Sequence, residues 1–415
     1  MAQRNLLFIA ALVLATFVGC QQAPPPQQGM WKGKLEMAGN KQLPFLMYLN
    51  LSQPAPWGYF LNGTEQTPIP EIYYRGDSVI FLFSEYGAAM HAVWKSGRFA
   101  GEFVRYRNDT VANTFEAVPL GASEQTPKEI PTAQVPLVGT FRAFFTQKDG
   151  IDTSSQATFW ARGDSVFGTI VETSGDLGLM AGKQSGDSVV LTRFTGWQGQ
   201  IVELTREQNS WKGVLTYRVP PPATFSLESR ARLTKELPLS ERPSMKQPRS
   251  PFTFSGVTVM GDTITNRSAQ FKGKVVLVDI MGTWCHNCMD AAPLLQKLYA
   301  EFSGQGLEIV GLTFELSDDA ARWRKNLLMF EERYGITFPI LFCGTTKPAN
   351  TEQKIKSQMN NFPGYPTTLF IDRKGTVRRI HGGFNGPGTG DAYQVQVNEY
   401  YETVRSLLKE RAAVR

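Results

Sequence analysis

The 415-residue sequence is poor in the residues that staple small scaffolds or hold metal ions, with four cysteines and three histidines. Four cysteines in a chain of this length do not make a disulfide-stapled scaffold. A zinc site takes four ligands, usually two cysteine pairs or one pair with two histidines. No two histidines here have ligand spacing. We therefore expect no bound metal ion.

The sequence also lacks a dense run of Lys and Arg. The net charge of +6 is small for the length and the basic residues are scattered, so nucleic-acid binding is not predicted. Hydrophobic residues make up 42% and charged residues 19%, which is ordinary for folded protein and argues against wholesale disorder. A chain of this length has room for two or three domains.

No apolar run is long enough to cross a bilayer, which takes roughly 17–25 residues. Residues 6–18 form a shorter apolar run between Arg4 and Cys20, and a segment rich in Pro and Gln follows. This order resembles a bacterial lipoprotein signal, in which the cysteine is lipidated and becomes the mature N-terminus. We expect a signal peptide over 1–19, lipidation of Cys20 and a flexible linker over 20–29. An ordinary signal peptide with an incidental cysteine is the alternative.

Residues 30–233 consist of short β-like runs broken by Gly, Asp and Ser. Aromatic-x-Gly triplets recur, and three turns read Gly-Asp-Ser-Val, beginning at Gly76, Gly163 and Gly186. We interpret these turns as hairpins rather than metal or ligand sites, because Asp and Ser bond their own backbone. The recurrence predicts a diverged internal repeat with halves at 30–120 and 137–233. We expect each half to be an antiparallel meander that curls into a barrel or sandwich.

A proline-rich polar linker over 234–251 separates the β-like region from residues 252–415, where the pattern of apolar residues is different. Apolar strand-like runs, among them Val275–Met281, alternate with two amphipathic helical segments. A hairpin at residues 372–375 and a final helix follow. The order βαβα, hairpin, helix predicts an α/β domain with a mixed sheet.

The apolar run Val275–Met281 leads into Trp284-Cys285-His286-Asn287-Cys288. The first backbone N–H groups of a helix starting near Cys285 have no partner within the helix, and they favour a thiolate at the first cysteine. A thiolate with a second thiol one turn away can attack a disulfide and then be resolved internally. The spacing therefore predicts dithiol–disulfide exchange, with a structural disulfide as the alternative. We expect no cofactor beyond the redox-active Cys285–Cys288 pair.

Residues from about 249 to 408 resemble the TlpA/ResA type of thioredoxin-like thiol–disulfide oxidoreductases. Three motifs carry the resemblance. The first is the run 272–279 followed by Gly-Thr-Trp-Cys285, and the second is Pro293, five residues after Cys288. The third is Tyr365-Pro366-Thr367-Thr368, which is similar to the cis-proline loop of the family. The resemblance implies a thioredoxin-like fold for this domain and leaves out the β-rich region.

The resemblance also implies catalytic roles. Cys285 would be the nucleophile and Cys288 the resolving thiol. Asp279 aligns with a buried carboxylate that takes the proton from the second cysteine. Pro366, as a cis-proline, would present the backbone of Tyr365 to a substrate chain.

Five further residues are expected to touch the substrate or tune the pair, namely Trp284, His286, Asn287, Tyr365 and Thr367. Trp284 would shield one side of the disulfide. His286 would stabilise the neighbouring thiolate when protonated or hydrogen-bonded. A glutamate that relatives often carry three residues after the second cysteine is replaced by Ala291, with Asp290 beside it. Cys343 and His381 are interpreted as packing residues.

The resulting function hypothesis is a thiol–disulfide oxidoreductase on the periplasmic side of a bacterial envelope, lipid-anchored to the inner or outer membrane. It would reduce protein disulfides, in cytochrome c maturation or disulfide repair. A membrane thiol carrier of the DsbD/CcdA kind would recharge it. One alternative is a peroxiredoxin-like peroxide reductase, although the Pro-x-x-x-Thr-like segment of those enzymes is missing. The other is a binding or scaffold lipoprotein in which the β-rich region is the functional part. The oligomeric state is not predicted.

Overall fold

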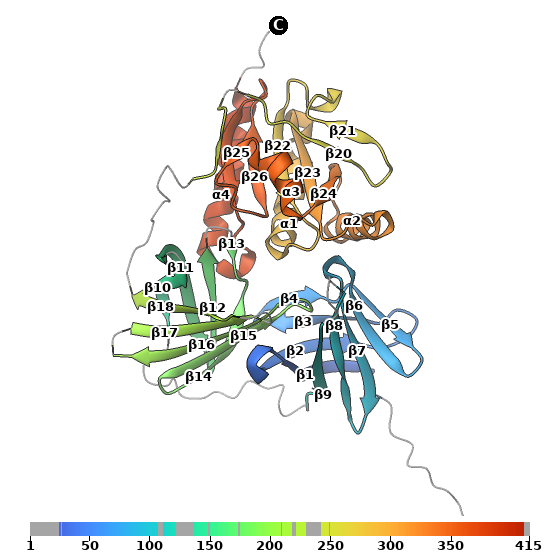
Figure 1. Ribbon diagram of the computed structural model, residues 1–415, viewed down its shortest axis with the longest axis vertical. Coiled ribbons are helices and arrows are strands. Elements are labelled where there is room, and N and C mark those ends of the chain that lie inside the picture. Colours follow the sequence, from blue (N-terminus) through green and yellow to red (C-terminus); the bar gives the residue numbers. More distant parts are fainter. Residues whose placement is uncertain are drawn as a thin grey trace, which may run out of the picture.

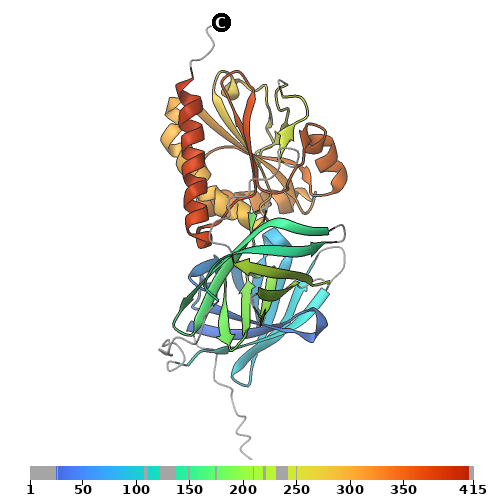
Figure 2. The same ribbon diagram turned by 90° about the vertical axis from the view of Figure 1, so that its left-hand side faces the viewer.

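The computed structural model describes residues 25, 27–106, 111–121, 137–147, 150–172, 175–208, 210–217, 221–229, 242–248 and 250–410. The expected signal peptide, Cys20 and most of the segments expected to join the domains lie outside the described residues. Two β units lie side by side beneath an α/β domain, as Figure 1 shows. The turned view of Figure 2 shows the same stacking, with the long C-terminal helix along one side of the α/β domain.

The first β unit is one antiparallel sheet of nine strands in the order β4-β3-β2-β1-β9-β8-β7-β6-β5. Its strands are β1 (Gln28–Glu36), β2 (Gln42–Asn50), β3 (Trp57–Asn62), β4 (Glu65–Pro68), β5 (Glu71–Arg75), β6 (Ser78–Phe83), β7 (Ala88–Lys95), β8 (Arg98–Arg105) and β9 (Val111–Pro119). The chain meanders through neighbouring strands, and the last strand, β9, returns to pair with β1. The unit is a half-barrel, with β4 and β5 at the ends of the sheet.

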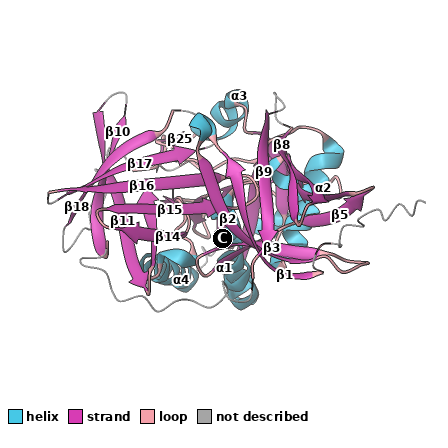
Figure 3. Cartoon of the chain, turned by 90° about the horizontal axis from the view of Figure 1, so that it is seen from below, coloured by secondary structure: helices cyan, strands magenta, loops and turns pink. Residues whose placement is uncertain are grey.

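The second β unit repeats this plan and closes on itself. Its strands are β10 (Gly139–Gln147), β11 (Gly150–Arg162), β12 (Ser165–Glu172), β13 (Gly175–Asp176), β14 (Met180–Ser185), β15 (Ser188–Phe194), β16 (Gly199–Glu207), β17 (Ser210–Tyr217) and β18 (Ala223–Ser229). The last strand, β18, again returns to the first, β10. Strand β11 pairs with both β10 and β12, which closes a barrel. Figure 3 shows the strands of the two units from below.

The predicted hairpin turns and the internal repeat are confirmed. Gly76, Gly163 and Gly186 have φ near +60°, and each leads a two-residue turn between paired strands. One aromatic-x-Gly triplet in each unit places its glycine under a cross-strand phenylalanine. A Cβ at Gly33 would lie 2.2 Å from the ring of Phe45, and one at Gly213 would lie 2.3 Å from the ring of Phe225.

The α/β domain has a seven-stranded mixed sheet in the order β21-β20-β24-β23-β22-β26-β27. Its strands are β20 (Ser255–Val257), β21 (Thr263–Thr265), β22 (Val275–Met281), β23 (Leu307–Glu315), β24 (Ile340–Thr345), β26 (Thr367–Ile371) and β27 (Val377–Gly382). Its helices are α1 (His286–Phe302), α2 (Ala320–Tyr334), α3 (Pro348–Thr351) and α4 (Asp391–Lys409). The predicted order of strands, hairpin and final helix is confirmed.

Strand β22 lies in the interior of this sheet, parallel to β23 and antiparallel to β26. All seven of its residues are buried. Val275 and Leu277 pack in the core that holds the apolar faces of α1 and α4, while Val276 and Val278 pack in a core on the other side. A central strand buried on both faces is a rigid base for the residues that follow it. From the segment that precedes this domain, β19 (Ser244–Met245) pairs with β25 (Met359–Asn360) of the domain.

Candidate active site

The cysteine pair lies where β22 gives way to α1. Cys285 is the N-cap of α1, and its Sγ accepts the backbone N–H of Cys288 at 3.2 Å. The two cysteines form a disulfide, with Cα atoms 5.2 Å apart. The helix therefore begins where the sequence predicted, with an orphan N–H of its first turn directed at sulfur. Pro293 lies inside α1, in the turn after the pair.

The loop that carries Cys285 is fixed by the end of the neighbouring strand β23. The indole N–H of Trp284 donates to the carbonyl of Phe314 at 2.8 Å. Glu315 accepts the backbone N–H of Thr283 at 3.0 Å and its hydroxyl at 2.8 Å. Glu315 is buried, and burial raises its pKa. Sequence reasoning missed this residue, although an acidic residue that ends an apolar strand was a visible signal.

The predicted proline loop lies beside the cysteine pair because β22 and β26 are antiparallel neighbours. Ile280 pairs with Thr367, so the residues after Ile280 approach those that precede Thr367. The Tyr365–Pro366 peptide bond is cis. The ring of Tyr365 meets that of Trp284 edge-on, with centroids 5.5 Å apart.

A second loop meets the proline loop at the same edge of the sheet. The backbone N–H of Gly383, just after β27, donates to the carbonyl of Pro366 at 2.8 Å. The hydroxyl of Thr367 donates to the carbonyl of Gly364 at 2.7 Å and so stays within its own loop. The start of α1, the proline loop and the loop after β27 therefore meet at the edge of the sheet where the dithiol lies.

Asp279 is buried in the middle of β22 and ends a chain of hydroxyl groups. The Tyr400 hydroxyl donates to Thr368 Oγ1 at 2.9 Å, and Thr368 Oγ1 donates to Asp279 at 2.9 Å. Burial raises the pKa of Asp279 to about 7. A carboxyl group with this pKa can take up or release a proton near neutral pH, which suits a general acid or base.

His286 does not face solvent, and its side chain is 12% exposed. Nη2 of Arg193, from β15, lies 2.5 Å from Nε2 of His286. A guanidinium group can only donate, so Nε2 accepts and the ring is neutral. Burial, and after it the Arg193 cation, lower the pKa of His286 to about 3. The protonated form expected to stabilise the thiolate is therefore not populated at neutral pH in this structure, and the hydrogen bond of the neutral ring is made to Arg193.

Three further residues considered from sequence have defined surroundings. Asp290 lies one turn after His286 on α1, with a carboxylate oxygen 3.3 Å from Nε2 of that histidine, while Ala291 is buried. Cys343 is buried in the core, and burial raises its pKa to about 12, so it is not a thiolate at neutral pH. His381 packs against Tyr400, and burial lowers its pKa to about 4.

The raised pKa of Asp279 predicts a specific dependence of stability on pH. Between its ordinary value of 3.8 and about 7, the unfolded chain has lost this proton while the folded protein keeps it. Unfolding then releases a proton, so rising pH lowers the free energy of unfolding across this window. Asp279→Asn cannot ionise, and its side-chain oxygen can still accept from Thr368. Between pH 4 and pH 8, the wild type should lose about 4 kcal/mol of stability relative to the variant.

Urea unfolding of the oxidised wild type and Asp279→Asn at both pH values measures this change. The other buried carboxyl groups are common to both proteins and cancel in the comparison. A stability difference that is the same at pH 4 and pH 8 would show that folding does not raise the pKa of Asp279.

Comparisons with known proteins match the α/β domain. A model of the AhpC/TSA family matches residues 250–380. The thioredoxin-like protein YneN of Bacillus subtilis is 33% identical over 130 residues, which is 31% of this chain and 68% of YneN. The thiol-disulfide oxidoreductase ResA of Geobacillus thermodenitrificans is 26% identical over 140 residues, covering 34% of this chain and 68% of ResA.

Among solved structures, a putative thiol:disulfide interchange protein DsbE from Chlorobium tepidum aligns with 18% identity and a TM-score of 0.31. The alignment covers 40% of this chain and 99% of that one. The resemblance inferred from the three motifs is confirmed by the sequence relatives. With 33% identity over more than two thirds of YneN, the chain belongs to the thioredoxin-like thiol–disulfide oxidoreductases.

Proposed function

We propose that this protein reduces disulfide bonds of other proteins, outside the cytoplasm and anchored to a membrane. The observation that carries the proposal is the position of Cys285 as the N-cap of α1, with its sulfur accepting the Cys288 N–H. A helix N-terminus stabilises negative charge, so the same place favours a thiolate once the disulfide is reduced.

Reduction of a substrate proceeds in two exchange steps. The Cys285 thiolate attacks one sulfur of the substrate disulfide, a Cys285–substrate disulfide forms, and the other substrate sulfur leaves as a thiolate that takes up a proton. Cys288 then loses its proton and attacks the Cys285 sulfur. The second substrate thiol is released, and the enzyme is left with the Cys285–Cys288 disulfide.

Two further groups complete the cycle. Asp279, with its raised pKa, is the proposed acceptor for the Cys288 proton. A dithiol carrier in the membrane, of the DsbD/CcdA kind, is the proposed donor of the two electrons and two protons that restore the reduced pair. The backbone of Tyr365, next to the cis-proline, is the proposed contact for the substrate chain.

Serine variants of the two cysteines test the exchange mechanism. Cys285→Ser should abolish reduction of insulin disulfides by the reduced protein, because serine is not a nucleophile toward disulfides under these conditions. Cys288→Ser should accumulate mixed disulfides with the substrate, visible on non-reducing gels, because nothing resolves them. Cys343→Ala is the matched control and should keep full activity, since that thiol is buried and protonated.

Full insulin reduction by Cys285→Ser would exclude the mechanism. Rapid oxidation of the reduced wild type by submicromolar peroxide, with slow reaction toward insulin, would favour peroxide reduction instead. Stopped-flow measurement of both reactions on the same preparation separates these outcomes.

The physiological direction is tested by the reduction potential of the Cys285–Cys288 pair. A reductant should have a potential near roughly −270 mV, whereas a strong oxidant has one near roughly −120 mV. Equilibration with a glutathione or dithiothreitol couple, followed by alkylation and mass spectrometry, gives the value. A potential at the oxidising end would reverse the proposed direction and leave the exchange chemistry intact.

The proposed anchor is a lipid on Cys20. Within the part of the chain that the structure describes, no helix is long and apolar enough to span a membrane. Because a lipid on Cys20 is the proposed attachment, Cys20→Ala should move the protein from the membrane fraction to the soluble extracytoplasmic fraction, and metabolic labelling with a fatty acid should be lost. Retention of Cys20→Ala in washed membranes would contradict lipid anchoring at this residue.

A further inference from the structure

The β-rich region rests on the end of the redox domain that carries the dithiol. The views of Figures 1 and 2 agree that both β units lie beneath this domain, on the side of α1 and the end of α4. In this arrangement Cys285 is 6% exposed and Cys288 is 2% exposed. A nucleophile that must reach the disulfide of a folded protein is thus enclosed.

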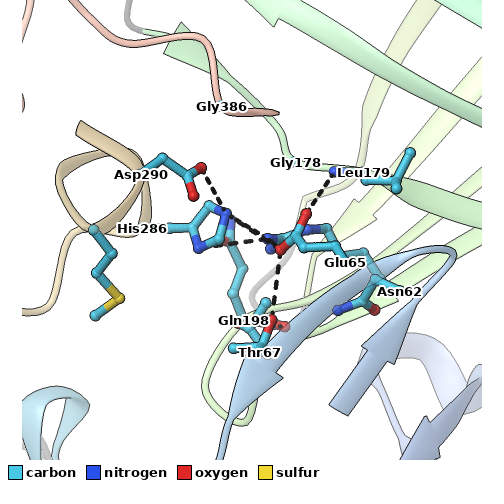
Figure 4. A network of polar contacts seen from close by, with 12 residues as sticks. Asn62, Glu65, Thr67, Gly178, Leu179, Gln198, His286, Asp290 and Gly386 are labelled. Atoms are coloured by element: carbon cyan, nitrogen blue, oxygen red, sulfur yellow. Dashed lines mark hydrogen bonds and ion pairs between the residues drawn. The ribbon is translucent and has the colours of Figure 1, made fainter. Parts of the chain in front are cut away.

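The first point of contact is the histidine between the two cysteines. Figure 4 shows His286 and Asp290 projecting from α1 toward Glu65, which begins β4 of the first β unit. Nη2 of Arg193 bridges Glu65 and His286, lying 2.6 Å from a carboxylate oxygen of Glu65 and 2.5 Å from Nε2 of His286. Arg193 comes from the second β unit and is 1% exposed. One buried cation therefore joins both β units to the CxxC motif.

The second point of contact is strand β13, which lies against the loops that flank the dithiol. Asp176 donates its backbone N–H to the carbonyl of Phe384 at 3.4 Å, and its carboxylate accepts the N–H of Gly386 at 2.5 Å. Its carbonyl accepts from the side chain of Asn287, the other residue between the cysteines, at 3.2 Å. A Cβ at Gly175 would lie 2.0 Å from Nδ2 of Asn287, so β13 fits closely against α1.

These contacts are of the kind that an extended substrate chain makes. Phe384 and Gly386 belong to the loop after β27 that bonds to the proline loop through Gly383. A substrate polypeptide gains register from main-chain hydrogen bonds to exposed backbone beside a site. Asp176 of β13 already occupies the carbonyl of Phe384 through its backbone N–H and the N–H of Gly386 through its carboxylate, so a protein substrate and β13 compete for these backbone groups.

A third set of contacts joins α1 and α2 to the first β unit. Arg333 of α2 pairs with the buried Glu85 of the first β unit at 3.0 Å, and the Tyr86 hydroxyl contacts Met289 Sδ at 3.1 Å. Lys325 pairs with Glu71 at 2.8 Å in a more exposed position. The buried apolar cluster of the first β unit continues through these residues into the redox domain.

The closed arrangement also carries internal costs. Burial raises the pKa of Asp176 to about 6 and that of Asp290 well above its ordinary value, while Nε and Nη1 of Arg193 have no hydrogen-bond partner among the described residues. Buried polar groups without partners, and buried acids that share one cation, each oppose closure. The contacts that hold the interface are therefore offset in part by these buried polar groups.

We propose that the β-rich region is a cover that occupies the protein-substrate surface of the redox domain, and that Arg193 and Asp176 decide which disulfides reach Cys285. Small disulfides enter with the cover in place, whereas a protein disulfide must displace β13 from Asn287 and the loop after β27. This inference rests on the proposed reduction of protein disulfides for its biological meaning. The cover limits access to Cys285, and this access can be measured without any disulfide substrate.

The test is alkylation of the reduced full-length protein with a small reagent, iodoacetamide, and with a maleimide carrying a long polyethylene glycol chain. Mass spectrometry of the peptide that contains Cys285 gives both rates. Arg193→Gln removes the bridging cation. The double variant Glu85→Gln with Arg333→Gln removes an interface ion pair outside the CxxC network. In both variants the rate with the bulky reagent, relative to iodoacetamide, should rise about tenfold, since each change weakens a charged contact of the closed state.

Two controls keep this experiment decisive. Arg98→Gln breaks an ion pair with Glu116 at the far end of the β7–β8 hairpin and should leave the ratio at the wild-type value. The peptide that contains Cys343 reports unfolding, because this thiol is buried in the redox-domain core and stays unmodified while the domain is folded.

The cover is overturned if the wild type reacts with the bulky reagent at the same relative rate as both interface variants. Insulin reduction separates this outcome from the proposed function. If the interface variants raise the alkylation ratio but the protein does not reduce insulin, only the proposed function is excluded. If the protein reduces insulin but the ratio is the same in the wild type and the variants, only the cover is excluded.

Discussion

The chemistry of this protein depends on the junction between strand β22 and helix α1. The strand is buried on both faces and paired on both sides, so its end is held in place by the whole sheet. The helix that follows has backbone N–H groups with no acceptor inside the helix, and that of Cys288 turns to the sulfur of Cys285. Glu315 fixes the connecting loop through Thr283. The reactive sulfur is thus positioned by backbone geometry rather than by a mobile side chain.

Buried acids serve two different purposes around this junction. Asp279 accepts a hydrogen bond from Thr368, and the Tyr400 hydroxyl supports Thr368 in turn. These groups belong to the sheet and α4, so the acid remains buried for as long as the domain is folded. Asp176 and Asp290 are instead buried between the β-rich region and α1, where they lose that burial if the two parts separate. The permanent burial of Asp279 suits proton transfer, whereas the burial of Asp176 and Asp290 suits a contact that can open.

Much of the redox domain could be predicted from the sequence. Apolar runs with the period of buried strands, helix caps and the Asp372 turn are local signals, and they gave the right order of elements. The spacing of Cys285 and Cys288 at a strand–helix boundary indicated the chemistry by itself. Glu315 was missed because its role depends on pairing with β22, which no local window shows. The charge of His286 could not be predicted either, because it depends on Arg193, which is 93 residues away in sequence.

In the β-rich region, too, some features could be predicted from the sequence and others could not. Its hairpin turns and its repeat were visible in the sequence because a turn needs only the φ freedom of Gly76 and its counterparts and the side chains beside them. Only the tertiary structure decided that the first unit stays open, that the second closes through β11 and β12, and that β13 reaches Asn287, 111 residues away in sequence. The sequence by itself determined a dithiol at a helix start, since that depends on neighbouring residues and backbone hydrogen bonds. The enclosure of that dithiol was decided by the tertiary structure, because it depends on how three folded units pack.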